Sequence, residues 1–446
     1  MTLVPTTLVK GKEAPEQTGG PALTSEATPR RGLWIMFLVA LALRLLVLTI
    51  GHSYRFPSIK DHFSFGWETG RLARSIASGN GFSSPFDAPS GPSAWVAPLY
   101  PYFLAGIFKL FGIYSTASAW IALAVNCFFS ALTCIPVFFI GKELFGEKVG
   151  KWSAWIWALA PFSIYWAIRF AWETSLATML FAFAFLLAVR MEEQNRLSRW
   201  LWFAFVWGLI ALSNPSLLTF LPFAGIWVLY RQQRKGTMKF RWALYSGLLF
   251  CAMIAPWMVR DYLTFHKVIL IRGNFGVELR MGNGPGADGQ LKPYIHPSQD
   301  PQQFELYRSM GEVAYARMRG QQAMEWIEQN PARFAEISLV RFYYYWCGTP
   351  RAVPDAEAIG RYMLVTLSSV LTFLGLGFAL RRHNRAAFLF VWMLLTVPTI
   401  YYFTYTHPRY RHPIEPEMLV LMVYLFTQLE PKPRKEKNSA SRLLSD

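Results

Sequence analysis

The chain has 446 residues, of which 53% are hydrophobic and only 16% are charged, and its formal net charge is +17. Soluble domains carry about 25% charged residues, so this composition excludes an ordinary soluble enzyme. The excess of Lys and Arg is typical of cytoplasmic loops that face anionic lipid, and we expect no nucleic acid partner.

Residues 1–32 are mostly polar and lack the apolar run of a secretory signal peptide. We therefore expect a disordered cytoplasmic tail followed by an uncleaved first span. Further along the chain, apolar runs near the 20 residues that cross a bilayer recur repeatedly. The predicted spans are 33–51, 116–140, 150–168, 171–189, 199–213, 216–230, 241–258, 359–380, 386–405 and 413–428.

The Asn214-Pro215 dipeptide separates two of these spans and is compatible with either a kink or a tight outer turn. One helix over 199–230 would overshoot a bilayer core of ~30 Å, so length favours the turn. The sequence thus predicts an all-α, polytopic integral membrane bundle of about ten spans.

Basic residues set the orientation of this bundle, because cytoplasmic loops carry the excess of Lys and Arg. Threading the spans with the N-terminus inside places at least three basic residues on every inner segment. It also places both termini in the cytoplasm. The inner loops then contain Lys142, Lys148 and Lys151; Arg190, Arg196 and Arg199; Arg231, Arg234, Lys235, Lys239 and Arg241; and Arg381, Arg382 and Arg385.

Two long segments remain outside, and they divide the chain. A first outer loop, 52–115, interrupts an N-terminal membrane region at 33–258 and contains predicted helices near 67–79 and 97–112. The second, 259–357, is too long for a simple connection and is predicted to be a subdomain with helices at 302–329 and 331–347. A C-terminal membrane region at 358–428 and a cytoplasmic tail at 429–446 follow.

Charged residues gather at the outer ends of the predicted spans. Charges near the hydrocarbon are functional candidates by default, since burying one at mid-bilayer costs about 2.5–3.5 kcal/mol. Each also has a structural alternative: an acid can cap a helix, and an arginine can reach the lipid headgroups. The candidates are Glu68, Glu173, Arg260 and the Arg409-Tyr410-Arg411-His412 cluster.

Four segments in this order resemble a known family. They are the first outer loop with GNGFSSPF and APLYPYFLAGIFKLFG; RFAWETSLAT; PWMVRDYLTFHKV with IRGNFGVELRMGN; and PRYRHPIEPEMLVL. Their arrangement is similar to bacterial GT-C glycosyltransferases of the dolichyl-phosphate-mannose-protein mannosyltransferase and aminoarabinose-transferase type. The resemblance implies a bacterial inner-membrane enzyme with its active site facing the periplasm. Such enzymes move a sugar from a polyprenyl-phosphate carrier to a glycan, lipid or protein acceptor and invert the anomeric carbon.

The resemblance also implies roles for the candidate residues. A carboxylate acts as the general base; relatives carry an Asp near the position of Phe65, which Asp61 and Glu68 flank here. Glu173 faces the sugar or the acceptor. Residues expected to bind the donor phosphate are Arg260, Arg272, Asn274, Arg409, Tyr410, Arg411 and His412.

No metal or cofactor is expected. The four cysteines have no paired spacing, and no HExxH pattern occurs. Asp61, His62 and Glu68 could in principle hold a divalent ion.

Two other classes of function fit parts of the pattern. A transporter or flippase for a lipid-linked sugar would share the phosphate-binding cations, but transporters place polar residues near the bilayer midplane. Here the interior spans are nearly free of charge, with Arg44 as the exception. An inactive scaffold subunit is the second alternative, because the family's Asp is missing.

Overall fold

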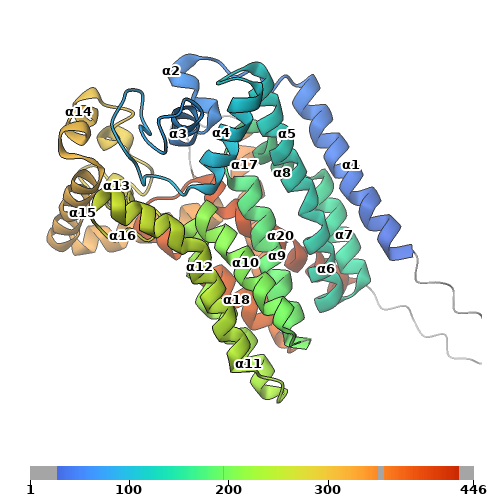
Figure 1. Ribbon diagram of the computed structural model, residues 1–446. Coiled ribbons are helices and arrows are strands. Elements are labelled where there is room, and N and C mark those ends of the chain that lie inside the picture. The colour runs from blue at the N-terminus through green and yellow to red at the C-terminus, as the bar shows by residue number, and fades with distance from the viewer. Residues whose placement is uncertain (1–27, 194, 350–355, 431–446) are drawn as a thin grey trace, which may run out of the picture.

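The computed structural model describes residues 28–193, 195–349 and 356–430. Over these residues the chain forms helices and no β-strand, with one isolated bridge between Ser83 and Pro92. The predicted all-α membrane bundle is confirmed (Figure 1). Most of the two predicted cytoplasmic tails lies outside the described residues.

The bundle contains α1 (Thr28–Ile50), α5 (Thr116–Leu132), α6 (Cys134–Phe145), α7 (Glu147–Leu159), α8 (Pro161–Arg169), α9 (Thr174–Glu193), α10 (Leu197–Ser213), η2 (Pro215–Thr219), α11 (Leu221–Arg234), α12 (Phe240–Phe265), α17 (Ala356–Arg381), α18 (Ala387–Thr396), α19 (Thr399–Phe403) and α20 (Glu415–Leu429). Within the described part, five helical stretches are long and apolar enough to cross a bilayer: Arg31–Ile50, Thr116–Phe145, Thr174–Glu193, Phe240–Phe265 and Ala358–Arg381. Each coincides with a predicted span.

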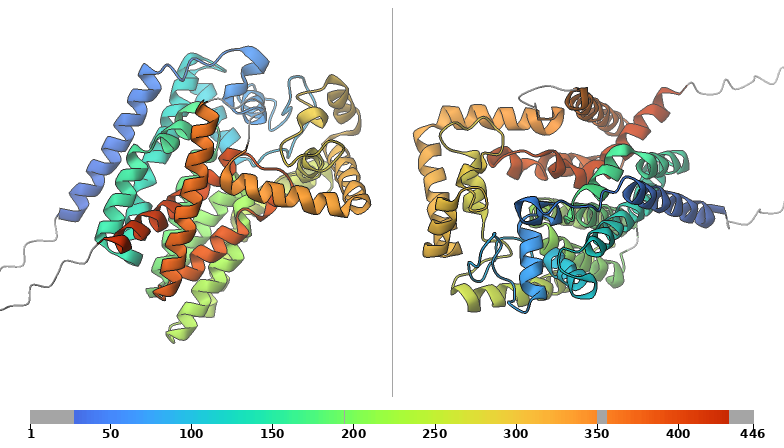
Figure 2. Two further views of the ribbon diagram at one scale, coloured as in Figure 1. Left: turned by 180° about the vertical axis from the view of Figure 1, so that it is seen from behind. Right: turned by 90° about the horizontal axis from the view of Figure 1, so that it is seen from above.

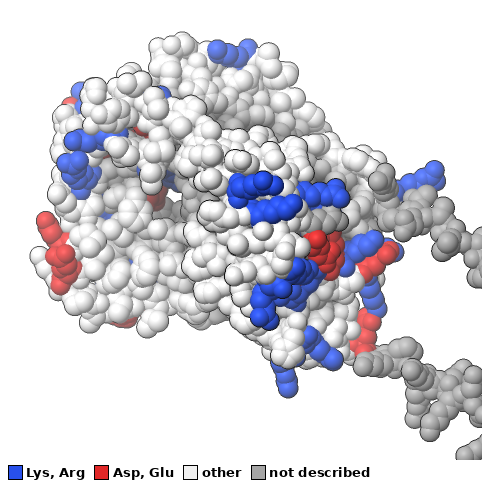
Figure 3. Space-filling view, turned by 60° about the horizontal axis from the view of Figure 1, so that its bottom comes forward, with Lys and Arg blue, Asp and Glu red and all other residues white. Residues whose placement is uncertain are grey.

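Helices that lie outside the bundle gather at one of its ends (Figures 1 and 2). They are α2 (Ile59–His62), η1 (Phe63–Phe65), α3 (Glu68–Ala77), α4 (Leu99–Phe111), α13 (Phe275–Gly282), η3 (Pro293–Ile295), α14 (Pro301–Met310), α15 (Glu312–Gln329), α16 (Pro331–Cys347) and η4 (Pro408–Ile414). Figure 3 brings the opposite end forward and shows Lys and Arg gathered there. The basic loops and the two outer segments therefore occupy opposite ends, as the predicted threading requires.

Proline and glycine account for the breaks within the predicted helices. At Pro215 the chain leaves α10 and turns through η2 into α11, so the predicted turn is present and the alternative of a kink within one helix is not. Pro398 separates α18 from α19 in the same way. The single helix predicted at 302–329 is instead two, because Gly311 adopts a φ of 80° between α14 and α15.

The buried charge of Arg44 in α1 has a structural explanation. Pro161 has no N–H to pair with the carbonyl of Trp157, so the α7–α8 junction leaves acceptors unsatisfied within the membrane region. The Arg44 guanidinium donates to the Ala158 carbonyl at 2.8 Å, to the Trp157 carbonyl at 3.1 Å and to Ser163 Oγ at 2.8 Å. Arg44 thus pairs with the carbonyl groups that the helix break leaves without an N–H partner. This explains a buried charge inside the bundle without a transported ligand.

The two outer segments are hydrogen-bonded to one another above the bundle. The buried Glu312 carboxylate at the start of α15 accepts hydrogen bonds from Ser93 Oγ and from the Ala94 N–H, both at 2.6 Å. The Gly273 N–H donates to the Ala94 carbonyl at 2.8 Å. These contacts fix the loop before α4 against the segment after α12, and the candidate site lies beneath them.

Candidate active site

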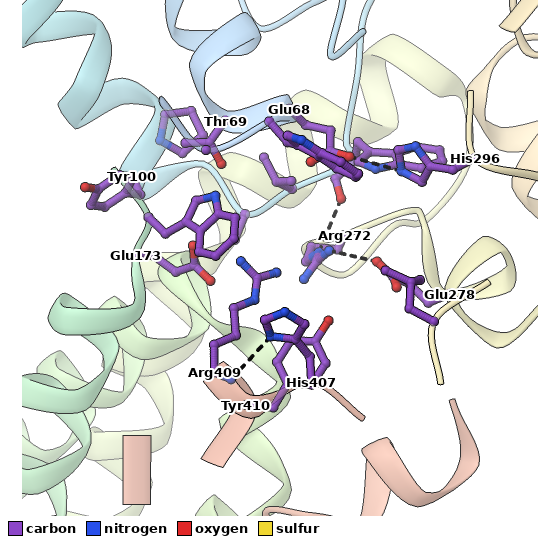
Figure 4. Close-up of a pocket in the computed structure, with 18 of the residues that line it drawn as sticks. Glu68, Thr69, Tyr100, Glu173, Arg272, Glu278, His296, His407, Arg409 and Tyr410 are labelled. Atoms are coloured by element: carbon purple, nitrogen blue, oxygen red, sulfur yellow. Dashed lines mark hydrogen bonds and ion pairs between the residues drawn. The ribbon is translucent and has the colours of Figure 1, made fainter. Parts of the chain in front are cut away.

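Two adjoining cavities lie where the outer segments meet the bundle. The outer cavity, of about 180 Å³, is lined by the start of α3, the start of α4 and the loop at 291–296. The lateral cavity, of about 350 Å³, is lined by the α10–η2 junction, α19 and the segment at 270–278. The residues shared by both linings form the wall between them: Glu173, Arg272, Glu278, Tyr405, Arg409 and Tyr410. All of them except Tyr405 are labelled in Figure 4.

Glu68 opens helix α3 and lines the outer cavity. Its Oε1 lies 3.0 Å from Nε2 of His296, and its side chain is 14% exposed. Burial alone would raise the pKa of Glu68, but the hydrogen bond from His296 and the charge of Arg71 lower it below its ordinary value. The carboxylate is therefore ionised at neutral pH, as a general base must be.

A tight turn packs the chain just before Glu68 against the chain just before Glu173. Gly66 has a φ of +94°, and a Cβ there would lie 2.6 Å from the Ala171 carbonyl oxygen. Only glycine allows this approach of the η1–α3 turn to the loop before α9. Glu173 in that loop lines both cavities, and its carboxylate turns toward the Arg409 guanidinium (Figure 4).

Arg409 belongs to η4 and is the wall residue that supplies the first cation. Its guanidinium carbon lies 4.1 Å from the ring centre of Trp172 and 5.3 Å from that of Tyr410. Burial disfavours the charged form, yet Tyr410 and Glu173 outweigh it and raise the pKa of Arg409, so the side chain stays cationic. Burial, with the charges of Arg409 and Arg361, lowers the pKa of His407 to about 3, so this imidazole is neutral.

Arg272 supplies the second cation of the wall. Its Nε donates to the Trp95 carbonyl at 3.2 Å, and an Nη atom lies 3.5 Å from Glu278 Oε1. Glu278 also accepts hydrogen bonds from Asn274 at 2.8 Å and from the Tyr405 hydroxyl. The predicted residue Asn274 thus lines the lateral cavity and holds Glu278 in place.

Some of the predicted phosphate-binding residues lie away from both cavities. Arg260 donates to the Ser93 carbonyl at 2.6 Å and to the Phe82 carbonyl at 2.9 Å. Arg411 donates to Ser369 Oγ at 2.8 Å on α17, and His412 Nδ1 lies 2.6 Å from Glu415 Oε2. In this structure these side chains support outer loops and helix ends.

Three wall and cavity residues were not predicted from the sequence: His296, Glu278 and Tyr405. Glu278 has a local signal in the sequence, because it lies one helical turn after Asn274. The side chain of Asp61, predicted as an alternative base, lies outside the described part of the structure. The described residues contain no group of three or more His, Cys, Asp and Glu side chains arranged to hold a metal ion.

This arrangement suits the transfer of a group that leaves as an anion. Two guanidiniums lie in one wall, where they can stabilise charge that develops on a phosphate. Carboxylates on the outer-cavity side can accept a proton from an incoming hydroxyl. The lateral cavity offers an apolar surface, including Leu218, Leu270 and Ile400, beside the same cations.

Comparison with known proteins finds one family match and several similar folds. Residues 95–259 match the sequence model of the family described as dolichyl-phosphate-mannose-protein mannosyltransferase. The fold is similar to that of the apo Archaeoglobus fulgidus oligosaccharyltransferase, with a TM-score of 0.50 and 12% identity, over 90% of this chain and 50% of that one. This chain therefore spans about half the length of that protein.

ArnT from Cupriavidus metallidurans, solved bound to undecaprenyl phosphate, is similar at a TM-score of 0.41 and 11% identity, over 88% of this chain and 77% of that one. No curated protein matches the chain in sequence. The family match and the fold confirm the predicted likeness to GT-C superfamily glycosyltransferases and support a polytopic membrane transferase.

Proposed function

We propose that this protein transfers a sugar from a polyprenyl-phosphate donor to an acceptor on the outer face of a bacterial inner membrane. The observation that carries the proposal is the position of Arg272 and Arg409. Both line a polar cavity that contains Glu68 and also an apolar cavity beside the spans. A donor with a charged phosphate between a sugar and a lipid needs this order of surroundings.

The donor phosphate binds at the wall and its lipid tail occupies the lateral cavity. Leu270 and Phe275 line that cavity, yet their side chains are 67% and 53% exposed. They therefore form an apolar rim through which the lipid tail of the donor can pass from the bilayer into the cavity. An apolar rim suits such a tail because the tail has no polar groups to pair. The two guanidiniums favour the phosphate most strongly as it departs and gains charge.

The sugar and the acceptor hydroxyl meet in the outer cavity. Glu68 accepts the proton of the acceptor hydroxyl while the oxygen of that hydroxyl forms a bond to the anomeric carbon. The bond from that carbon to the phosphate oxygen breaks at the same time. Attack from the side opposite the departing phosphate inverts the anomeric carbon. Glu173 is part of the wall and orients the sugar. A positioned carboxylate base contributes about 10²–10⁴-fold to such a reaction.

The basic end of the bundle supports an outward-facing site. Lys and Arg gather at the end opposite the cavities, which supports a cytoplasmic position for that end (Figure 3). The acceptor then approaches from the periplasmic side.

The test is a donor-turnover assay on the full chain reconstituted in liposomes. Polyprenyl-phosphate donors carrying different labelled sugars are supplied together with a membrane extract as the source of acceptors. We expect one donor to lose its sugar to an acceptor, and Glu68→Gln and Arg409→Ala each to slow this transfer by about 10²-fold or more. Movement of intact donor across the bilayer without cleavage would instead establish the flippase, and neither result would favour the scaffold.

A further inference from the structure

His296 lies in the loop between η3 and α14, far from Glu68 in the sequence, and both of its ring nitrogens have partners. Nε2 lies 3.0 Å from Glu68 Oε1. On the other side, Nδ1 accepts a hydrogen bond from the Ser298 N–H at 3.2 Å and lies 2.7 Å from Ser298 Oγ. A backbone N–H can only donate, so Nδ1 is an acceptor and the ring proton resides on Nε2. His296 therefore donates to the Glu68 carboxylate.

Aromatic rings hold the imidazole in this orientation. The rings of Phe86 and Trp95 each lie 5.6 Å from it edge-on, and Trp67 lies 5.7 Å away. The side chain of His296 is only 6% exposed. Rotation of the ring would require these neighbours to move, so the direction of its N–H is fixed by packing.

We propose that His296 is a positioning residue for the base: its Nε2–H holds Oε1 of Glu68 and leaves Oε2 to take the acceptor proton. The proposal rests on the proposed function, in which Glu68 is the base. The proton passes from the acceptor hydroxyl to Glu68, while His296 stays neutral and keeps its own proton. Positioning matters here because a misplacement of about 1 Å can cost on the order of 10²-fold in rate.

The inference makes the second outer segment part of the catalytic apparatus. Glu68 comes from the first outer loop, and the residue that orients it comes from the second. The same two segments meet at Glu312, Ser93 and Ala94. The base is therefore assembled only when the two outer segments are docked.

Three substitutions separate positioning from a structural role. His296→Gln keeps a side-chain N–H near the place of Nε2, His296→Asn moves it near the place of Nδ1, and His296→Phe removes it. The kinetic constants kcat and KM are measured with the labelled polyprenyl-phosphate donor as a function of pH. Binding of the sugar-free polyprenyl phosphate serves as the folding control. Gln and Asn have similar polarity, so their comparison remains informative if His296→Phe does not fold.

We expect His296→Phe and His296→Asn to lower kcat about 10²-fold with little change in KM, and His296→Gln to retain most of the rate. The acidic limb of the curve of kcat/KM against pH should move to higher pH in His296→Phe and His296→Asn. In both variants Glu68 loses a hydrogen bond that favours its charged form. The charged group that acts on Glu68 is Arg71, and it is unchanged in all three variants.

The contrary outcomes are distinguishable. If Glu68→Gln is inactive while Gln, Asn and Phe at position 296 all keep the wild-type kcat and pH limb, the positioning role is wrong and the proposed function stands. If Glu68→Gln keeps the full rate, the base assignment fails and the role of His296 fails with it.

Discussion

The Arg409 guanidinium lies over the Trp172 ring, 4.1 Å from its centre, at the wall between the two cavities. A guanidinium held on an aromatic face keeps its charge and leaves its N–H groups free to point outward. Trp172 directly precedes Glu173, so one short loop orients both an acid and the cation beside it. This contact is the basis of the first prediction.

Arg409→Ala should reduce kcat/KM for the polyprenyl-phosphate donor by about 10²–10³-fold, the usual loss when a group that stabilises the leaving charge is removed. Arg409→Lys should fall between, because a lysine keeps the charge without the two-pronged contact to phosphate. Arg308→Ala, at an exposed arginine on α14, is the matched control. Equal rates for Arg409→Ala and Arg308→Ala would remove Arg409 from the site.

Arg411→Ala should affect stability and leave catalysis intact. Its guanidinium is buried and bonds to Ser369 Oγ and the Val365 carbonyl of α17. Removing it strips these groups and Glu415 of a partner, at a cost of roughly 3 kcal/mol. The measurement pairs a thermal midpoint in detergent with the rate per folded molecule. A normal midpoint with lost transfer would instead support the phosphate-binding role predicted from the sequence.

The spans could be predicted because each apolar run carries its own signal, and basic loops alternate with outer ones along the chain. Glu68, Glu173 and Arg409 could be grouped for the same reason, since all three lie at outer helix ends. The breaks at Thr133 and Gly311 were missed. Each break occupies a single residue between two helices, so it interrupts the residue pattern too briefly to be recognised.

The side-chain partners could not be predicted, because they come from distant segments. Nothing near His296 in the sequence indicates Glu68, and nothing near Arg260 indicates the carbonyls of Phe82 and Ser93 that it binds. Gly282 likewise depends on a contact from a distant segment. In the structure, a Cβ at Gly282 would lie 1.7 Å from the Thr404 carbonyl oxygen, so that glycine is needed for packing.

The pH dependence of transfer should follow the lowered pKa of Glu68. A base must be unprotonated, so activity is lost as pH falls through the pKa of the folded protein, which lies below the ordinary Glu value of about 4.3. We expect kcat/KM to stay flat from neutral pH down to about pH 5. Glu68→Gln should lose about 10²–10⁴-fold, while Glu305→Gln, at an exposed acid, loses none. A limb near pH 7 that survives in Glu68→Gln would identify another base.

Glu312 should make stability depend on pH in the opposite sense. Burial, partly offset by hydrogen bonds from Ser93 and Ala94, raises its pKa to about 7. The folded state therefore holds a proton that the unfolded chain loses near pH 4.3, and this stability is lost as pH rises from there toward 7.

Glu312→Gln removes this titration, so its thermal midpoint should match the wild type at about pH 4 and exceed it at about pH 8. The corresponding difference in the free energy of unfolding at about pH 8 should be on the order of 2–4 kcal/mol. Parallel curves for the two proteins across this range would mean that the buried carboxyl does not titrate there.

The most direct measurement is a structure of the protein with polyprenyl phosphate bound. The account predicts the phosphate within hydrogen-bond distance of Arg272 and Arg409, with the first isoprenes in the lateral cavity beside Leu270 and Ile400. Phosphate density at Arg260 or Arg411, with the lateral cavity free of lipid, would contradict it.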